Sequence, residues 1–382
     1  MKWEKVKLGN VCEITSSKRI FYSEYVDDGV PFYRSKEIIE SDEGKVIENP
    51  LYISVDKYNE IKEKFGVPQT GDMLLTSVGT IGIPYIIKKK DCFYFKDGNL
   101  TWFRDFREGL NSKYLYYWIK SSEGTGILYN TTIGSSQKAL TISALKNIKV
   151  SLPPRSVQDK IVEVVSAYND LIENNQKQIK LLEEAAQRLY KEWFVDLRFP
   201  GHENTKIVDG VPEGWSRGLL KELISVNYGK DHKKAPDDGN IPVYGSGGLM
   251  RKCNKSLFSG EAVLIPRKGS LNNIMYVDET FWTVDTMFYA TMKQPHTAIF
   301  VYFFVKAFDM YSMNIGAAVP SMTTKILDAM DVVIPDKETL EKFDKYAKVY
   351  FNKIKTLHGQ NERLKTARDL LLPKLMSGEV KV

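Results

Sequence analysis

The sequence predicts an α+β protein with a pseudo-two-fold internal repeat, in which two mixed, β-rich globular domains are joined by two long helices that pair as a coiled coil. Three observations lead to this prediction: an apolar pattern with coiled-coil spacing, a second copy of that pattern later in the chain, and short strand-like runs ahead of each copy. The expected boundaries are residues 1–150 for the first domain, 151–197 for the first helix, 198–331 for the second domain and 332–382 for the second helix.

The first long helix is predicted over residues 155–195, a length of about 60 Å at about 1.5 Å per residue. Its apolar positions alternate in steps of four and three residues, which is the spacing of a coiled-coil seam. Ser156, with Asp159 three residues later, is typical of a capped helix start, and Pro200-Gly201 is typical of a stop. The seam positions are Ile161, Val165, Tyr168, Ile172, Asn175, Ile179, Leu182, Ala186, Leu189 and Trp193.

The same pattern returns 182 residues later without a gap. The identical pairs include Tyr168/Tyr350 and Leu182/Leu364, and a helix with one apolar seam needs a partner, so the two helices are predicted to pair with each other. Pro373 stands near the end of the second copy, where a kink or fraying is expected. The second seam comprises Phe343, Ala347, Tyr350, Ile354, Leu357, Asn361, Leu364, Arg368, Leu371 and Leu375.

The globular domains begin alike, with Trp3 and Leu8 in the first and Trp215 and Leu220 in the second, and a linker is expected near residues 198–212. Runs of β-branched and aromatic residues separated by turn residues predict strands in both. Gly-rich phrases also correspond, Ser77-Val78-Gly79 with Arg267-Lys268-Gly269. Two interpretations of these glycines remain: turns that require positive φ, which we prefer, or small tips placed against a ligand backbone.

Composition narrows the class of protein. The chain has 382 residues, is 43% hydrophobic and carries a net charge of +6, which permits a polyanionic partner without requiring one. The three cysteines are scattered, and the sequence has neither a signal-peptide pattern nor an apolar stretch long enough to span a membrane. These features predict a cytoplasmic protein with reduced thiols and no membrane partner.

The sequence contains no recognisable catalytic motif. The segment 66–72 begins like a phosphate-binding loop, but Asp72 stands where such a loop needs lysine. The four histidines have no companions at metal or catalytic spacing, and Glu60-Ile61-Lys62 is more typical of a solvated helix than of a nuclease motif. We therefore predict a non-catalytic chain that holds no metal or cofactor of its own.

Four segments together resemble the specificity subunit of type I restriction–modification enzymes, and the resemblance covers the whole chain. They are SLPPRSVQDKI at 151–161, WFVD at 193–196 running into Pro200-Gly201, VPEGW at 211–215, and LPKLMSGE at 372–379. The resemblance implies two target-recognition domains that each read one half of a bipartite double-stranded DNA sequence. It also implies that the two helices pack antiparallel as a spacer.

The resemblance further implies partners that carry the chemistry. Methyltransferase subunits, two per chain, are expected to dock on this subunit and to methylate adenine with S-adenosylmethionine. A restriction subunit is expected to add ATP- and magnesium-dependent translocation and cleavage. None of these cofactors is expected in this chain.

Recognition of DNA requires cations for phosphates and polar groups for base edges. Each polar cluster alone is typical of a solvated loop, and the resemblance makes them candidates. The candidate DNA-binding residues are Lys18, Arg19, Tyr33, Arg34, Lys36, Ser77, Thr80, Ser136, Gln137 and Lys138 in the first domain, and Lys230, His232, Lys233, Lys234, Ser246, Arg251, Arg267, Lys268 and Ser270 in the second.

Several alternatives stay open at this point. Asn175 and Asn361 are either tolerated polar residues near solvent or buried residues that set the helix register. Trp193 and Phe194 belong either to the core, which is the preferred assignment, or to a subunit-docking patch. Two other functions compete: a stand-alone DNA methyltransferase or nuclease with an unrecognised site, and a structural coiled-coil scaffold with protein-binding domains.

Overall fold

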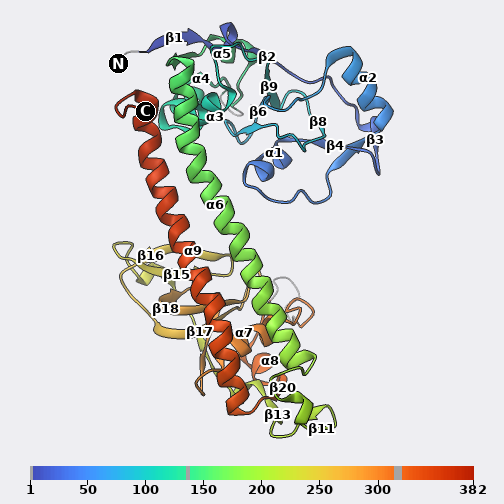
Figure 1. The fold of residues 1–382 in the computed structure, drawn as a ribbon, viewed down its shortest axis with the longest axis vertical. Coiled ribbons are helices and arrows are strands. Elements are labelled where there is room, and N and C mark those ends of the chain that lie inside the picture. Colours follow the sequence, from blue (N-terminus) through green and yellow to red (C-terminus); the bar gives the residue numbers. More distant parts are fainter. Residues whose placement is uncertain (1–2, 135–137, 314–320) are drawn as a thin grey trace. The chain divides into compact units, whose positions relative to one another are not determined.

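The computed structural model describes residues 3–134, 138–313 and 321–382, and the chain divides into two compact units (Figure 1). Unit 1 comprises Met1–Asn174 and Gln360–Val382, and unit 2 comprises Asn175–Gly359. Each unit therefore contains one globular part together with a segment of both long helices. This division differs from the predicted boundaries, which assign the helices to segments of their own.

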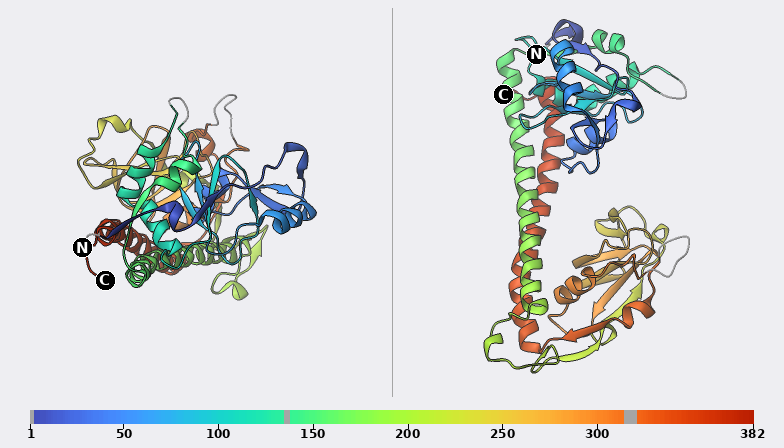
Figure 2. Two further views of the ribbon diagram at one scale, coloured as in Figure 1. Left: turned by 90° about the horizontal axis from the view of Figure 1, so that it is seen from above. Right: turned by 90° about the vertical axis from the view of Figure 1, so that its right-hand side faces the viewer.

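Both long helices are present. Helix α6 spans Arg155–Tyr190 and continues as a π-helical turn over Lys191–Val195, while α9 spans Lys337–Ser377 (Figures 1 and 2). Two details of the prediction are wrong. Helix α6 begins at Arg155 as predicted, but the predicted cap at Ser156 is wrong, because Ser156 lies inside the first turn and the carbonyl of Pro154 accepts the first amides. Helix α9 continues through Pro373 to Ser377, so it does not fray at the proline.

In unit 1, the first turns of α6 lie beside the last turns of α9, so the two segments run antiparallel (Figure 1). Ile161 and Val165 are buried in the same core as Leu375, with Leu371 packed against it. Arg368, the one cation in the predicted seam, donates a 2.7 Å hydrogen bond from its guanidinium to the side-chain oxygen of Asn169. The partly exposed arginine thus obtains a polar partner on the facing helix.

In unit 2, the seam is apolar and then strongly aromatic. Ile179, Ile354 and Leu357 form a small cluster with Leu182 packed against it. Further along, the ring of Phe343 lies 5.8 Å from that of Trp193 and 4.8 Å from that of Phe194, centroid to centroid. Trp193 is buried and Phe194 packs against the same core, as do Leu189 and Tyr350, which confirms the preferred core assignment.

Other seam positions follow the predicted spacing. Ile172 is buried, while Tyr168 and Leu364 are half-buried. Asn175 and Asn361 are only 7% and 4% exposed, which excludes the interpretation that they sit near solvent. A buried amide in an apolar seam is tolerable only where its polar atoms are satisfied, and this favours the register-setting interpretation.

The globular part of unit 1 contains two four-stranded sheets and a two-stranded ribbon. The sheets have strand orders β2-β9-β6-β7 and β3-β5-β4-β8, and β1 pairs with β10. The strands are β1 (Glu4–Lys7), β2 (Glu13–Thr15), β3 (Tyr25–Val26), β4 (Val30–Tyr33), β5 (Leu51–Ile53), β6 (Met73–Thr76), β7 (Pro84–Ile86), β8 (Tyr94–Phe95), β9 (Leu100–Arg104) and β10 (Lys149–Leu152). The helices are α1 (Ser35–Asp42), α2 (Val55–Phe65), α3 (Ser112–Lys120), α4 (Ser122–Thr131) and α5 (Ile142–Asn147).

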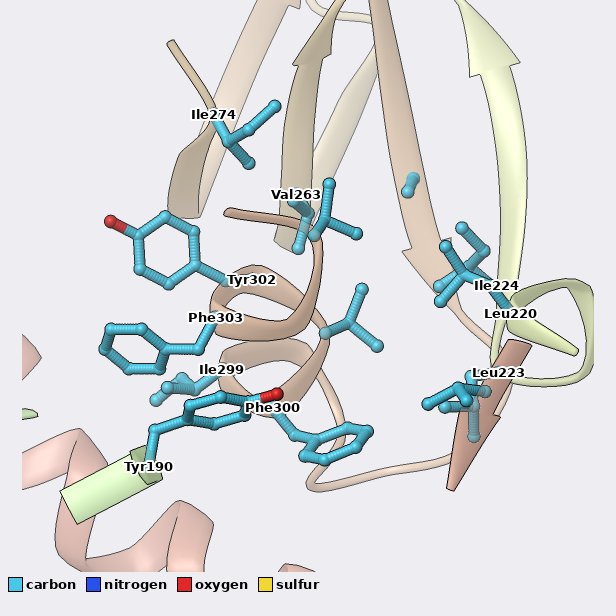
Figure 3. Close-up of a cluster of buried hydrophobic side chains, with 14 of the residues drawn as sticks. Tyr190, Leu220, Leu223, Ile224, Val263, Ile274, Ile299, Phe300, Tyr302 and Phe303 are labelled. Atoms are coloured by element: carbon cyan, nitrogen blue, oxygen red, sulfur yellow. The ribbon is translucent and has the colours of Figure 1, made fainter. Parts of the chain in front are cut away.

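The globular part of unit 2 is built around a six-stranded sheet of order β14-β19-β17-β18-β15-β16, and β13 pairs with β20. One face of the sheet packs on α7, whose Ile299, Phe300 and Phe303 meet Tyr190 of α6 (Figure 3). The strands are β11 (Ile207–Val208), β12 (Val211–Pro212), β13 (Ser216–Leu219), β14 (Ile224–Tyr228), β15 (Ile241–Gly245), β16 (Gly248–Cys253), β17 (Phe258–Pro266), β18 (Met275–Thr283), β19 (Met287–Met292) and β20 (Asp331–Ile334), and the helices are α7 (Ala298–Lys306) and α8 (Thr324–Asp328).

The internal repeat extends from the helices into the globular parts. Thr141 and Thr323 each cap a short helix by accepting an amide hydrogen bond, from Ala144 and Ile326 respectively. The amides of Leu8 and Leu220 donate equivalent 2.9 Å hydrogen bonds, to the carbonyls of Ile148 and Met330. Both units therefore share one framework, formed by the first strand, the capped helix and the strand that leads into a long helix.

A second equivalence was missed in the sequence. The segment VPFYRS at 30–35 corresponds to IPVYGS at 241–246. Both segments form strands, β4 and β15, and each makes the parallel pair of its unit, β4 with β8 and β15 with β18. The two strands lead into different elements, because α1 begins at Ser35 whereas β16 begins at Gly248.

Candidate nucleic-acid interface

Three loops that carry predicted DNA-binding residues meet at one turn in unit 1. This turn, residues 96–99, connects β8 to β9. The amide of Lys96 donates to the carbonyl of Tyr33, and the carbonyl of Asn99 accepts from the amide of Ser77, at 2.9 and 2.8 Å. The carboxylate of Asp97 pairs with Arg19 at 2.9 Å. The fold therefore joins the loops around residues 16–19, 33–36 and 77–80 into one edge.

Unit 2 repeats the main-chain bonds of the second and third loops, and a main-chain bond holds its first loop where unit 1 has an ion pair. The carbonyl of Thr283 accepts from the amide of Lys230, and the amide of Val284 donates to the carbonyl of Tyr244. The amide of Arg267 donates to the carbonyl of Thr286 at 2.8 Å. The loops around residues 228–234, 245–248 and 267–270 are thus the counterparts of the three loops of unit 1. We call each set the three-loop edge of its unit.

The third loops match in detail. Isolated bridges join Val78 to Ala139 and Lys268 to Ser321, and Ser321 follows Ala139 by the same 182 residues that separate the two long helices. Gly79 and Gly269 both adopt positive φ, +78° and +86°, where a side chain would be strained. The preferred interpretation of these glycines as turn residues is confirmed.

Comparison with known proteins decides the family. The model of the type I restriction modification DNA specificity domain matches residues 1–184 and again residues 212–366. The chain belongs to this family. Its two matched segments are the specificity domains, and each contains one three-loop edge.

Relatives and a solved structure agree with this assignment. The chain is 26% identical over 432 residues to the type I restriction enzyme MjaIX specificity subunit of Methanocaldococcus jannaschii, covering 100% of this chain and 94% of the relative. It is 23% identical to the HindI specificity subunit of Haemophilus influenzae, covering 63% of this chain and 71% of that one. The crystal structure of the type I restriction–modification S subunit from M. genitalium has the same fold, with a TM-score of 0.63, 17% identity, and coverage of 98% and 96%.

The first specificity domain presents several of the predicted cations to solvent. The ammonium of Lys18 lies 4.4 Å from the ring centre of Phe65, and that of Lys138 lies 3.7 Å from the ring centre of exposed Tyr129. Lys36 is exposed and pairs with Glu40, and Thr80 is exposed at the tip of its loop. Ser136 and Gln137 lie outside the described residues.

Other predicted residues of the first domain have structural roles. Ser77 is 1% exposed, and its hydroxyl lies 2.7 Å from that of Thr101, so it offers no group to a ligand. The guanidinium of Arg34 donates to buried Glu37 at 2.6 Å, and the ring of Tyr33 stacks on Phe93 at 4.3 Å. Burial opposes ionisation of Glu37, but the hydrogen bonds from Arg34 outweigh it and hold the pKa of that carboxyl below its usual value.

In the second specificity domain, Lys230, Lys233, Lys234, Lys268 and Ser270 are exposed, and His232 is half-buried. Ser246 lies directly beside Gly269, since a Cβ atom at Gly269 would stand 2.7 Å from the Ser246 hydroxyl oxygen. The predicted residues of the second and third loops are therefore neighbours.

Two arginines of the second domain differ in whether their guanidinium groups are free to contact DNA. Arg267 lies over the ring of Tyr228, 5.4 Å from its centre. Arg251 instead donates to Asp237 and to the carbonyls of His232 and Ala235, the last at 2.7 Å. It fastens β16 to the preceding loop, so we remove Arg251, like Ser77 and Arg34, from the set proposed to contact DNA.

Sequence reasoning missed the aromatic residues at these edges. Tyr228 is 53% exposed at the end of β14, two residues before Lys230, and Tyr129 is 62% exposed beneath Lys138. An aromatic residue shortly before a basic loop was the available signal for Tyr228. Nothing in the local sequence connects Tyr129 with Lys138, because helix α4 and the bridge at Ala139 bring them together.

Within the described ranges, no group of three or more His, Cys, Asp or Glu side chains is arranged to hold a metal ion. Among the helices of those ranges, none combines the length and the apolar character needed to cross a bilayer.

Exposed lysines of the two edges provide a direct test of DNA contact. Lys18 and Lys230 occupy equivalent first loops, and neither forms an ion pair among the described residues. Replacing either with alanine is expected to weaken DNA binding several-fold and to reduce the slope of log affinity against log salt by about 1, because one phosphate contact is lost. The measurement is a salt titration of DNA binding by the complex with its modification subunits.

The control is Lys206→Ala, which removes an exposed lysine from the linker outside both edges. An unchanged salt slope in both Lys18→Ala and Lys230→Ala, equal to that of the control, would rule out phosphate contact by these lysines.

Proposed function

We propose that each specificity domain reads one half of a bipartite double-stranded DNA sequence through its three-loop edge. The observation that carries the proposal is the repeated main-chain scaffold with different side chains on it. Lys18 corresponds to Lys230, but Ser16 corresponds to Tyr228, and Val78 to Lys268. A shared backbone would let both specificity domains dock on DNA in the same geometry. The different loop side chains would let each domain recognise different bases.

The proposed contacts divide by chemistry. Lys18, Arg19, Lys36 and Lys138 in the first domain, and Lys230, Lys233, Lys234 and Lys268 in the second, are assigned to phosphates because they are exposed cations. Thr80, Ser246, Ser270, His232 and Arg267 are assigned to base edges, where hydroxyl, imidazole and guanidinium groups can hydrogen-bond.

We assign recognition to residues 1–150 and 198–331 and the spacer helices to 151–197 and 332–382. Two modification subunits are proposed to dock on each chain and to supply S-adenosylmethionine-dependent adenine methylation. Restriction subunits are proposed to supply the ATP- and magnesium-dependent steps. The relatives' names, type I restriction enzyme specificity subunits, support this division of labour.

The test is methylation with and without the partner. The purified chain with S-adenosylmethionine is expected to leave DNA unmodified, and addition of the modification subunit of the same system is expected to produce methylation at one bipartite sequence. Methylome sequencing of cells that express both would give the two half-sites and the gap between them.

Two results would contradict the proposal. Methylation by the rigorously purified chain alone would favour a stand-alone methyltransferase. A complex that binds all DNA sequences equally at a fixed salt concentration would favour a structural scaffold.

A further inference from the structure

The ribbon formed by β15 and β16 in unit 2 exposes two neighbouring apolar side chains. Leu249 is 58% exposed and Met250 is 54% exposed. Strand β16 is the edge of the six-stranded sheet, so β15 and β16 project a two-stranded antiparallel ribbon. Two adjacent large apolar residues at an exposed sheet edge carry a solvation cost and point to a binding role.

A bulge in the ribbon explains their orientation. Val243 pairs with Arg251 and Tyr244 pairs with Leu249, so Met250 is the extra residue on its strand. Bulges re-aim side chains and are common next to functional sites. The Met250 side chain passes over Gly245, where an added Cβ atom would stand 2.4 Å from its sulfur. Gly245 is therefore the residue that leaves space for Met250.

The surroundings of this pair are basic. Lys252 is exposed on the same strand, Lys268 is exposed on the loop that contacts Ser246, and Lys230 lies beside the end of β18. None of the three forms an ion pair within the described part of the chain. Arg251 holds the ribbon to the loop before it through three hydrogen bonds, which limits movement of its tip. An apolar pair with exposed, unpaired lysines on its own strand and on neighbouring loops is complementary to a polyanion that displays small apolar groups.

We propose that Leu249 and Met250 contact the C5 methyl groups of thymines in the major groove of the second half-site; this rests on the proposed function. The major groove is about 12 Å wide and admits a two-stranded β-ribbon. The thymine methyl is the apolar feature of that groove, and aliphatic side chains recognise it. The exposed Lys230, Lys252 and Lys268 are assigned to neighbouring phosphates.

Among the described residues of the first specificity domain there is no equivalent ribbon. Its equivalent strand, β4, is followed by α1 at Ser35, so no ribbon extends from it. Contacts of this kind are therefore assigned to the second half-site only, and the first half-site serves as an internal control.

The experiment uses the complex of the full chain with its modification subunits. The DNA is an unmethylated duplex that contains the target sequence identified by methylome sequencing. Each thymine of the second half-site is replaced in turn by deoxyuridine, which removes only the methyl group. We expect a roughly fourfold loss of affinity at one or two positions, the factor expected for one buried methyl. In Leu249→Ala and Met250→Ala variants that loss should disappear at the position each contacts, while deoxyuridine in the first half-site should act as in the wild type.

Ile207→Ala, which truncates an exposed isoleucine of the β11–β12 hairpin, is the matched control and should keep the full deoxyuridine effect. The inference is overturned if the second half-site contains no thymine, if no replacement weakens binding, or if the Leu249→Ala/Met250→Ala double variant keeps the wild-type sensitivity. Weaker binding of the variants without deoxyuridine dependence would indicate a wedge between bases and also overturn it. A wild-type complex with no preference for its target over scrambled DNA would instead refute the proposed function.

Discussion

A chain that carries residues 225–321 in place of residues 13–139 is expected to direct its modification subunits to methylate only DNA in which the second half-site stands on both sides of the gap. The junctions follow from the repeated framework, in which Leu8 and Leu220 make the same hydrogen bond and Thr141 and Thr323 cap the same helix. The exchanged segment contains the complete three-loop edge, and the retained segments β1 and β10 still pair with each other.

The measurement is methylome sequencing of cells that express this chain with its modification subunit. Because each half-site is proposed to be read by one three-loop edge, and the edge that reads the first half-site has been replaced, the original target should lose its methylation. The reciprocal chain, with residues 13–139 in place of residues 225–321, is the matched control and should recognise the first half-site twice. Retention of the original target by either chain would show that the three-loop edges do not determine the sequence.

Phe343→Ala is expected to destabilise unit 2 by roughly 3–5 kcal/mol, the usual cost of truncating a buried phenylalanine. Phe343 is 0% exposed, and its ring contacts those of Trp193 and Phe194, with Tyr190 at 6.3 Å. Removal of the ring leaves a cavity between α9 and the end of α6 within this unit. Since domain stability is typically about 5–15 kcal/mol, this loss removes a large share of the stability of unit 2 and should lower its unfolding midpoint markedly.

Thermal and urea unfolding of the purified chain would measure this effect. Val349→Ala on the same helix is the control, since Val349 is 65% exposed and its truncation should cost less than about 0.5 kcal/mol. Equal midpoints for the two variants would contradict the assignment of Phe343 to the core. Methylation should fall with Phe343→Ala and remain with Val349→Ala.

The long helices and the repeat could be predicted because each is encoded in local spacing. Steps of four and three residues place Ile161, Val165 and Ile172 on one face of the helix whatever the tertiary structure, and these residues are buried. The internal repeat presents the same apolar spacing a second time, which is independent evidence for the helix. Four short segments around the two helices indicate the family. The strand-rich character of both globular parts was equally visible, because β-branched and aromatic runs between turns need no long-range information.

The binding edges depend on contacts between residues far apart in the chain, and local patterns do not contain them. The turn at 96–99 joins loops whose residues lie up to about 80 positions away, and only its main-chain hydrogen bonds bring Tyr33 and Ser77 together. For the same reason Arg34, Ser77 and Arg251 were chosen for their polar groups, although the folded chain uses those groups internally. Leu249 and Met250 were missed because apolar residues in a strand are usually core, and only the edge position and bulge of β16 expose them.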